Sequence, residues 1–101
     1  MSGILARGKF AAPIDRAAVA ADWRARGYSC ATFVDPPGRC WENYVHGCNE
    51  LVTVVEGQLE MEVAGETLRV ASGDEVFIPR GARHSVRNVH ADTSVWLYGY
   101  D

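Results

Sequence analysis

Hydrophobic and polar positions follow two different spacings along this chain. In its first part, Val19 and Trp23 lie four residues apart within an alanine-rich stretch, which is the spacing of one face of an α-helix. Asp15 is a suitable N-cap, so the pattern predicts a helix over about residues 15–26. We expect residues 1–27 to form an N-terminal segment whose helix packs on the outside of the structure that follows.

The second part, residues 28–101, is predicted to be a single all-β domain. Short segments rich in β-branched and aromatic residues are separated by turns containing proline or glycine, which is typical of an antiparallel sandwich or barrel. The predicted strands cover residues 29–34, 39–46, 50–56, 59–63, 67–70, 75–78, 84–88 and 93–100.

One predicted strand is apolar on both of its faces. Leu51, Val52, Val54 and Val55 occupy both parities of the strand, so both faces are expected to be covered. One cover is the barrel interior, and the other is the helix or a second subunit. Because this strand needs more cover than one helix provides, we expect a homodimer.

Composition and charge indicate which kinds of partner and which cellular location to expect. A chain of 101 residues is expected to be one domain, and ten Lys and Arg against thirteen Asp and Glu give a formal charge of −3. This charge mildly repels phosphate backbones, so we expect no nucleic-acid partner. The first ten residues hold no apolar run of the length of a secretory signal or membrane anchor, and three cysteines without CxxC spacing predict reduced thiols. We therefore expect a cytoplasmic protein with no membrane partner.

Two of the three histidines stand beside turn signals, with an acidic residue close to one of them. His46 precedes Glu50, and His84 follows a turn containing Pro79 and Gly81. Two imidazoles and one carboxylate suit a divalent transition metal and leave positions open for water or substrate. The pattern therefore predicts a metal site, provided that His84 arrives from a separate strand.

Two motifs in this region resemble those of a known family. The first, H-x-H-x3-E-x6-G, is matched at three of its four positions by His46, Glu50 and Gly57. The second, G-x5-P-x-G-x2-H-x3-N, is matched at every fixed position by Gly73, Pro79, Gly81, His84 and Asn88. In this order they resemble the two motifs of the cupin superfamily over residues 44–88, and the strand rhythm extends the resemblance to about 28–100.

The resemblance implies a fold and a site. The fold would be a cupin double-stranded β-helix, or jelly-roll barrel, with the N-terminal helix packed outside. Its interior would hold one divalent transition metal (Zn, Fe, Mn, Ni or Cu), with His46, Glu50 and His84 as ligands. The resemblance also implies a small-molecule ligand and supports the expected homodimer.

The sequence departs from the first motif at Tyr44, which stands where the family has a histidine. Tyr44 is either an additional phenol ligand or a cavity-wall residue that orients a bound molecule. If residues 44 and 46 point inward, alternation predicts that Glu42 does too, while Trp41 points outward. Tyr44 and Glu42 are therefore the catalytic candidates, with Glu42 either a general base or a rim carboxylate paired with an arginine.

Three further side chains are candidates for the site. Cys48, between the proposed ligands His46 and Glu50, is either a thiolate ligand or a small turn residue. Trp96 and Tyr98 share one parity of the last strand, and they form either core or the lining of the pocket. The sequence leaves open which parity of residues 94–100 faces the barrel interior.

Three functions fit these observations. The leading hypothesis is a metal-dependent enzyme that acts on a small organic molecule by dioxygenase-, isomerase- or decarboxylase-like chemistry. The second is a module that binds or senses a small molecule or metal without turnover. The third is a structural dimer with a vestigial metal site, in which Tyr44 fills the place of the missing histidine.

Overall fold

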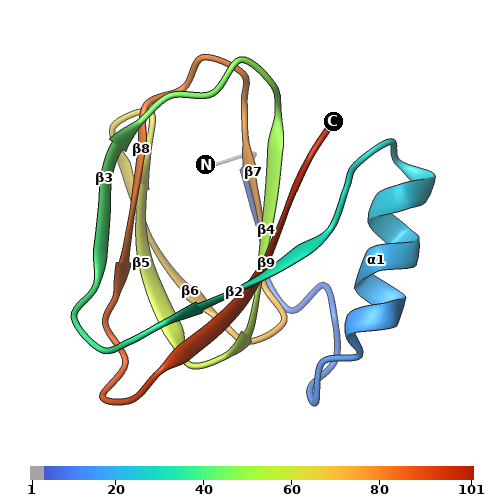
Figure 1. Ribbon diagram of the computed structural model, residues 1–101, viewed down its shortest axis with the longest axis horizontal. Helices are drawn as coiled ribbons and strands as arrows, with labels where there is room; N and C mark the ends of the chain where they lie inside the picture. The colour runs from blue at the N-terminus through green and yellow to red at the C-terminus, as the bar shows by residue number, and fades with distance from the viewer. Residues whose placement is uncertain (1–3) are drawn as a thin grey trace.

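The computed structural model describes residues 4–101, which fold into one helix and nine strands (Figure 1). Residues 1–3, the start of the expected N-terminal segment, lie outside the described residues. In chain order the elements are β1 (Leu5–Ala6), α1 (Arg16–Ala25), β2 (Ala31–Asp35), β3 (Cys40–Tyr44), β4 (Glu50–Glu56), β5 (Gln58–Val63), β6 (Glu66–Ala71), β7 (Glu75–Ile78), β8 (His84–Asn88) and β9 (Ser94–Tyr100).

The strands form two sheets that face each other (Figure 1). The first has the order β1-β7-β4-β9-β2, and the second has the order β3-β8-β5-β6. All pairings between these strands are antiparallel, and neighbours such as β4 and β9 are distant in sequence. This arrangement confirms the predicted all-β jelly roll with one helix outside it.

Helix α1 has the ends that its sequence predicts. The Asp15 carboxylate accepts hydrogen bonds from the Ala17 and Ala18 amides at 3.0 and 3.3 Å, which satisfies amides that have no partner within the helix. At the other end, Gly27 has a φ of +88° and donates to Arg24, while the Tyr28 amide donates to Trp23. This pair of bonds is a Schellman motif, which glycine favours because it adopts positive φ without strain.

The helix covers the outer face of the five-stranded sheet (Figure 1). Val19 and Trp23 from α1 pack with Leu51 from β4 and Leu97 from β9, and all four are almost fully buried. The predicted two-sided cover of β4 is therefore present within one chain. The helix covers one face, and the barrel interior covers the other.

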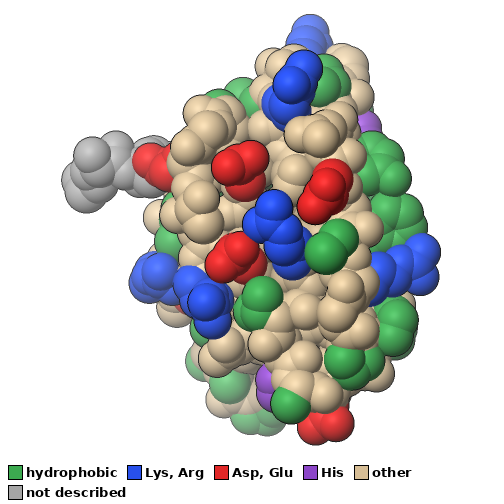
Figure 2. Space-filling view, turned by 90° about the vertical axis from the view of Figure 1, so that its left-hand side faces the viewer, with side chains coloured by type: hydrophobic (Ala, Val, Ile, Leu, Met, Phe, Trp, Pro, Cys, Tyr) green, Lys and Arg blue, Asp and Glu red, His purple; other side chains and the backbone are tan. Residues whose placement is uncertain are grey.

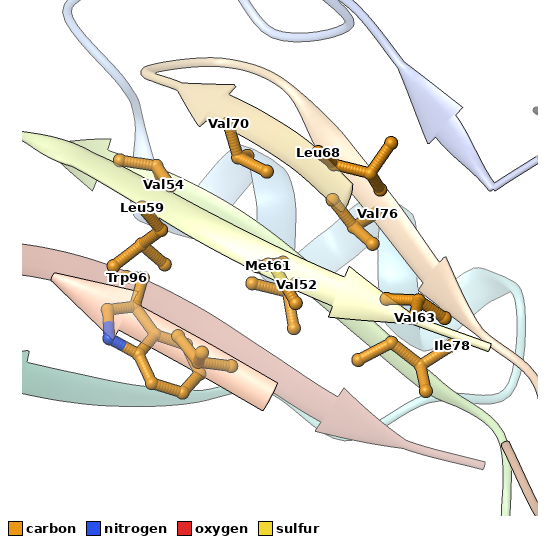
Figure 3. Packing of buried hydrophobic residues seen from close by; sticks show 11 residues of the cluster. Val52, Val54, Leu59, Met61, Val63, Leu68, Val70, Val76, Ile78 and Trp96 are labelled. Atoms are coloured by element: carbon orange, nitrogen blue, oxygen red, sulfur yellow. The ribbon is translucent and has the colours of Figure 1, made fainter. Parts of the chain in front are cut away.

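Between the sheets, one part of the interior is filled with aliphatic side chains (Figure 3). Val52 and Val54 of β4 meet Leu59 and Met61 of β5, and none of the four is exposed. Burying a side chain of this size contributes about 1.5–3 kcal/mol to folding. This packing holds the two sheets together and leaves the opposite part of the interior for other side chains.

Strand β3 contains a β-bulge that the period-two pattern did not predict. Trp41 pairs with Val86, and Tyr44 pairs with His84, so β3 has one residue more than β8 over this interval. Asn43 takes the left-handed conformation, with a φ of +57°.

The predicted orientation of the residues before Tyr44 was consequently wrong. Trp41 packs against the interior cluster, and Glu42 is exposed. The reason is that the extra residue reverses the alternation of side chains within the strand, so that two residues three apart share a face.

Glu42 belongs to a charged surface on the outer face of the four-stranded sheet. Seen from the side of β3 and β8, acidic and basic side chains lie next to one another across this face (Figure 2). Arg87 lies 2.9 Å from Glu60 and 3.9 Å from Glu42, and Arg69 lies 3.8 Å from Glu60. Glu42 is therefore paired with an arginine, on the side of the sheet that faces away from the interior.

Within the described part of the chain, α1 is the only helix, and it is too short and too polar to cross a membrane. The sequence predicted the main strands to within a few residues but missed the short strand β1, which pairs with β7 at the edge of the sheet. Two residues are too few to give a periodic pattern.

Candidate metal centre and its cavity

A cavity of about 230 Å³ lies between the two sheets, on the side where β2 and β9 face β3 and β8. Its walls are largely apolar and combine residues from both sheets with one residue from the loop before β4. The lining residues are Phe33, Trp41, Tyr44, His46, Glu50, His84, Val86, Trp96, Tyr98 and Tyr100. The parity that the sequence left open in β9 is therefore settled, because Trp96, Tyr98 and Tyr100 face the interior.

Three of these side chains form a compact cluster. His46, Glu50 and His84 each present a ligand atom, and all these atoms lie within 4.8 Å of one another. Nε2 of His46 is 3.5 Å from Oε1 of Glu50, and Nε2 of His84 is 3.6 Å from the same oxygen. The structure thus brings together the two histidines and the acid that the sequence placed up to 38 residues apart.

Each residue of the cluster is held by a different part of the backbone. Glu50 begins β4, where it pairs with β7 on one side and β9 on the other. His84 begins β8, and its Nδ1 lies 3.2 Å from the Ala82 carbonyl, which leaves Nε2 directed toward Glu50. His46 lies in the loop before β4, and its carbonyl accepts a hydrogen bond from the Gly81 amide at 3.0 Å. The loops that carry the two motifs are therefore joined at the site.

Glu50 is a buried carboxylate with an unpartnered oxygen. The residue is 4% exposed, and its Oε1 accepts no hydrogen bond within the described part of the chain. Burial disfavours the charged form and raises the pKa of Glu50 to about 7. An unpaired buried carboxylate is costly, so this position calls for a cation or a proton.

Burial also changes the titration of the neighbouring groups. It lowers the pKa of His84, outweighing the hydrogen bond to Ala82, and the nearby His46 acts in the same direction. Burial, followed by the charge of Glu50, raises the pKa of Tyr100 to about 12. At neutral pH, His84 is therefore a neutral imidazole with a lone pair available, and Tyr100 is a protonated phenol.

These observations fit a divalent transition metal. Neutral imidazole and carboxylate are the donors that such metals prefer. Two ligands about 2.1 Å from one ion in a tetrahedral site are roughly 3.4 Å apart, which matches the 3.5 and 3.6 Å between the imidazole nitrogens and Oε1. A cation bound among the three would also give the orphaned oxygen of Glu50 a partner.

The remaining predicted site residues divide into two groups. Tyr44 lies on the cavity wall, 41% exposed, with its ring centroid 6.3 Å from that of His46 and 6.4 Å from that of His84. Cys48 is half-buried and Glu42 is exposed. Neither residue belongs to the cluster or to the cavity lining.

The sequence analysis missed two residues of the cavity wall. Trp41 was expected on the other face, for the reason given above. Phe33 of β2 was not singled out, because it is the only aromatic residue between Tyr28 and Trp41 and belongs to neither motif. The centroid of its ring lies 5.3 Å from that of Trp41 and 5.4 Å from that of Trp96.

The last residue of the second motif organises the turn before β9. The Asn88 side chain donates to the carbonyls of Asp35, Pro36 and Asp92 at 2.9–3.1 Å, and its Oδ1 accepts from the Ser94 hydroxyl at 2.7 Å. These bonds join the ends of β2, β8 and β9. Asn88 therefore acts as a structural residue, as expected for a side chain that replaces backbone partners in loops.

A family model agrees with the fold. The model of the cupin domain matches residues 31–100 of the chain. This chain belongs to the cupin family. Its members commonly bind a metal, and the His46, Glu50 and His84 cluster lies within the matched region.

Individual cupins and related proteins show how far the similarity extends. The polyketide synthase CurC of Streptomyces cyaneus is 36% identical over 63 residues, which are 62% of this chain and 41% of that protein. The crystal structure of TT1209 from Thermus thermophilus is 27% identical and has a TM-score of 0.66, covering 72% of this chain and 71% of that one. The salicylate 1,2-dioxygenase of Pseudoaminobacter salicylatoxidans shares the fold, with a TM-score of 0.67 at 18% identity over 73% of this chain and 20% of that one. The curated relative is thus more than twice as long as the segment that matches it.

Proposed function

We propose that this cupin is a metal-dependent enzyme that acts on a small organic molecule in the cavity between its sheets. His46, Glu50 and His84 would hold one divalent transition metal, which is Zn, Fe, Mn, Ni or Cu. The observation that carries the proposal is the buried Oε1 of Glu50, which has no hydrogen-bond partner and lies within 3.6 Å of two imidazole nitrogens. A metal ion explains why a carboxylate is buried among neutral groups.

When bound, such a metal polarises a substrate oxygen or lowers the pKa of a bound water. The residues around it have distinct roles. Glu50 supplies the negative charge, and the Ala82 carbonyl fixes the ring of His84. Tyr100, whose phenol stays protonated, is available as a hydrogen-bond donor on the wall. Tyr44, at the exposed edge, orients the bound molecule or contributes a phenol oxygen to the metal.

Metal content tests the ligand assignment. Protein purified without added metal is expected to carry close to one transition-metal ion per chain by mass spectrometry. A His84→Ala variant should lose most of this metal. His90→Ala is the matched control, because His90 is the one histidine outside the cluster, and it should keep the wild-type load. An unchanged load in His84→Ala would refute the assignment.

A non-catalytic binding or sensing role is the second candidate, and one observation favours it. Apart from the three proposed ligands, the lining residues of the described chain are apolar or phenolic, so no further carboxylate or lysine faces the cavity to transfer a proton. Turnover assays on the metal-loaded protein decide between the two roles. The similarity to CurC makes oxygen-rich, polyketide-type molecules the first substrates to assay.

Three further expectations stay predictions. The division into an N-terminal segment (1–27) and a barrel domain (28–101) is one, and the cytoplasmic location is another. The third is the homodimer, although α1 already covers the second face of β4 within one chain. Light scattering on a size-exclusion column would give twice the chain mass of 11.1 kDa for a dimer, and a value of 11.1 kDa would refute it.

A further inference from the structure

The cavity wall is built from aromatic rings that touch one another. Phe33 stands edge-on to Trp41 and Trp96, with interplanar angles of 67° and 64°. The series continues along β9, with 5.7 Å between the ring centroids of Trp96 and Tyr98 and 5.9 Å between those of Tyr98 and Tyr100. Edge-to-face contacts of this kind are favourable and fix the rings relative to one another. The wall therefore has a defined shape.

The two tryptophans are tied to a single buried carboxylate, Asp35 at the end of β2. Asp35 is 0% exposed, its Oδ1 accepts from Nε1 of Trp41 at 3.1 Å, and its Oδ2 accepts from Nε1 of Trp96 at 2.9 Å. Trp41 belongs to the four-stranded sheet and Trp96 to the five-stranded sheet. One side chain thus links indoles from the two walls. Nε of Arg39 lies 3.8 Å from Oδ1 of Asp35, and Cζ of Arg39 lies 4.3 Å from the centroid of the Trp41 ring. Arg39 therefore contacts both Asp35 and one of its indole partners.

These hydrogen bonds determine which parts of the two indoles can contact a ligand. Because both N–H groups donate to Asp35, neither is free to donate into the cavity, and the indoles present only ring surface there. The polar atoms of the His46, Glu50 and His84 cluster lie in the same cavity. A cavity of about 150 Å³ is large enough for benzene, so 230 Å³ accommodates one substituted ring.

We infer that the cavity binds a planar aromatic molecule that carries an oxygen donor, and that Asp35 is the positioning residue of this site. The ring lies against the walls that Trp41 and Trp96 form, and the oxygen donor points to the His46, Glu50 and His84 cluster. This inference rests on the proposed metal site and adds to it the class of ligand. Asp35 acts through the indoles and does not itself touch the ligand.

A matched pair of probes tests the preference for a flat ring. Benzoate and cyclohexanecarboxylate have the same number of carbon atoms and the same carboxylate, but only benzoate is planar. For the metal-loaded wild type, titration followed by tryptophan fluorescence is expected to show benzoate binding at least tenfold more tightly. Equal affinities of the two acids would overturn the inference.

The role of Asp35 is tested by Asp35→Asn, which keeps the shape but turns an amide NH2 toward one indole N–H. We expect the tenfold preference for benzoate to fall below threefold and the near-ultraviolet circular dichroism of the indoles to weaken, while the metal content stays at the wild-type level. Asp74→Asn is the control, because Asp74 is also buried and hydrogen-bonded but has no hydrogen bond to a residue of the cavity wall. It should keep the full preference.

Two outcomes separate this inference from the proposed function. Wild-type protein that binds no metal contradicts the metal site, whereas metal-loaded protein without a preference for benzoate contradicts the aromatic ligand. If Asp35→Asn does not fold, Trp41→Phe decides, because it keeps an aromatic ring and removes one of the two N–H donors. A preference for benzoate that is unchanged in Trp41→Phe, or in folded Asp35→Asn, would overturn the role of Asp35.

Discussion

Two buried glutamates in neighbouring strands of one sheet have opposite surroundings. Glu75 in β7 is 5% exposed, and Glu50 in β4 is 4% exposed. Arg26 forms two hydrogen bonds to the Glu75 carboxylate at 2.8 and 3.0 Å, and Trp23 and Lys9 contribute one each at 3.1 and 3.4 Å. Glu50 faces two imidazoles at distances too long for hydrogen bonds.

The pKa values of the two carboxyl groups reflect this difference. Burial alone would raise the pKa of Glu75, but the hydrogen bonds from Arg26, Trp23 and Lys9 outweigh it and hold the pKa below its usual value. Burial raises the pKa of Glu50 to about 7 with nothing to oppose it. For Glu75, a buried carboxylate with a structural role, the chain itself provides the cations, Arg26 and Lys9. At the candidate metal centre, the described chain places no cation beside Glu50, so the carboxylate takes up a proton or a cation from outside the chain.

Metal binding is the largest effect expected from this comparison. At a metal concentration a thousandfold above the dissociation constant, binding stabilises the folded state by about 4 kcal/mol. For a domain of this size, the melting temperature should rise by roughly 15 °C or more when metal is added back to chelator-treated protein. Differential scanning calorimetry measures the shift.

In that experiment, Glu50→Gln is expected to lose most of the shift, since a neutral amide is a poor replacement for a carboxylate ligand. Glu75→Gln should keep it, because its carboxylate belongs to the helix contact. A full shift in Glu50→Gln would show that the metal binds elsewhere.

The second effect concerns the free energy of unfolding without metal. Glu75→Gln should lower it by about 2 kcal/mol, because hydrogen bonds to a charged group are weakened. Glu50→Gln should leave it unchanged or raise it, because the substitution removes an unpaired buried charge. Urea denaturation in the presence of a chelator measures both variants. The comparison fails if Glu50→Gln is the less stable of the two.

The third effect is a dependence of stability on pH. The pKa of Glu75 is lower in the folded chain than in the unfolded chain, so its contribution is fully present above pH 4.5 and is lost as the pH falls through the folded value. The stability difference between wild type and Glu75→Gln should therefore shrink as the pH falls below 4.5. Urea denaturation between pH 3 and 6 measures this difference, and a constant difference would contradict the prediction.

The smallest effect is expected at Asp22, which pairs with Arg26 at 2.8 Å on the exposed side of α1. Its side chain is 38% exposed, and such pairs contribute about 0.5 kcal/mol or less. Asp22→Asn should therefore change the urea midpoint only slightly. A loss as large as that of Glu75→Gln would show that pairing, and not burial, determines the contribution of these carboxylates.

The sequence predicted the clustering of His46, Glu50 and His84 better than the surroundings of these residues. The motif spacing around His46, Glu50 and His84 was informative because it places two of these residues at the starts of strands and the third in the loop before β4. The strand pattern was also informative, since alternation and turn residues report on local structure. The site residues predicted from the motifs were therefore found close together.

The contacts of the two buried acids Asp35 and Glu75 could not be predicted. Asp35 meets Trp96, 61 residues away, and Glu75 meets Arg26, 49 residues away. The local pattern of hydrophobic and polar residues carries no information on contacts between residues so far apart in the sequence, because these contacts depend on how the sheets and the helix pack. An acidic residue in a strand pattern gives no sign of whether it faces solvent, a cation or two indoles.

The bulge in β3 makes the backbone conformation of this strand as important as its composition. In a regular strand of the same length, residues three apart such as Trp41 and Tyr44 would point to opposite sides of the sheet, and the bulge at Asn43 keeps both rings inside. Without the bulge, one of the two rings would leave the interior, although every aromatic residue of the chain is retained. In proteins descended from a common ancestor with this one, a β3 that keeps its length but loses the left-handed residue would therefore enclose a differently shaped chamber.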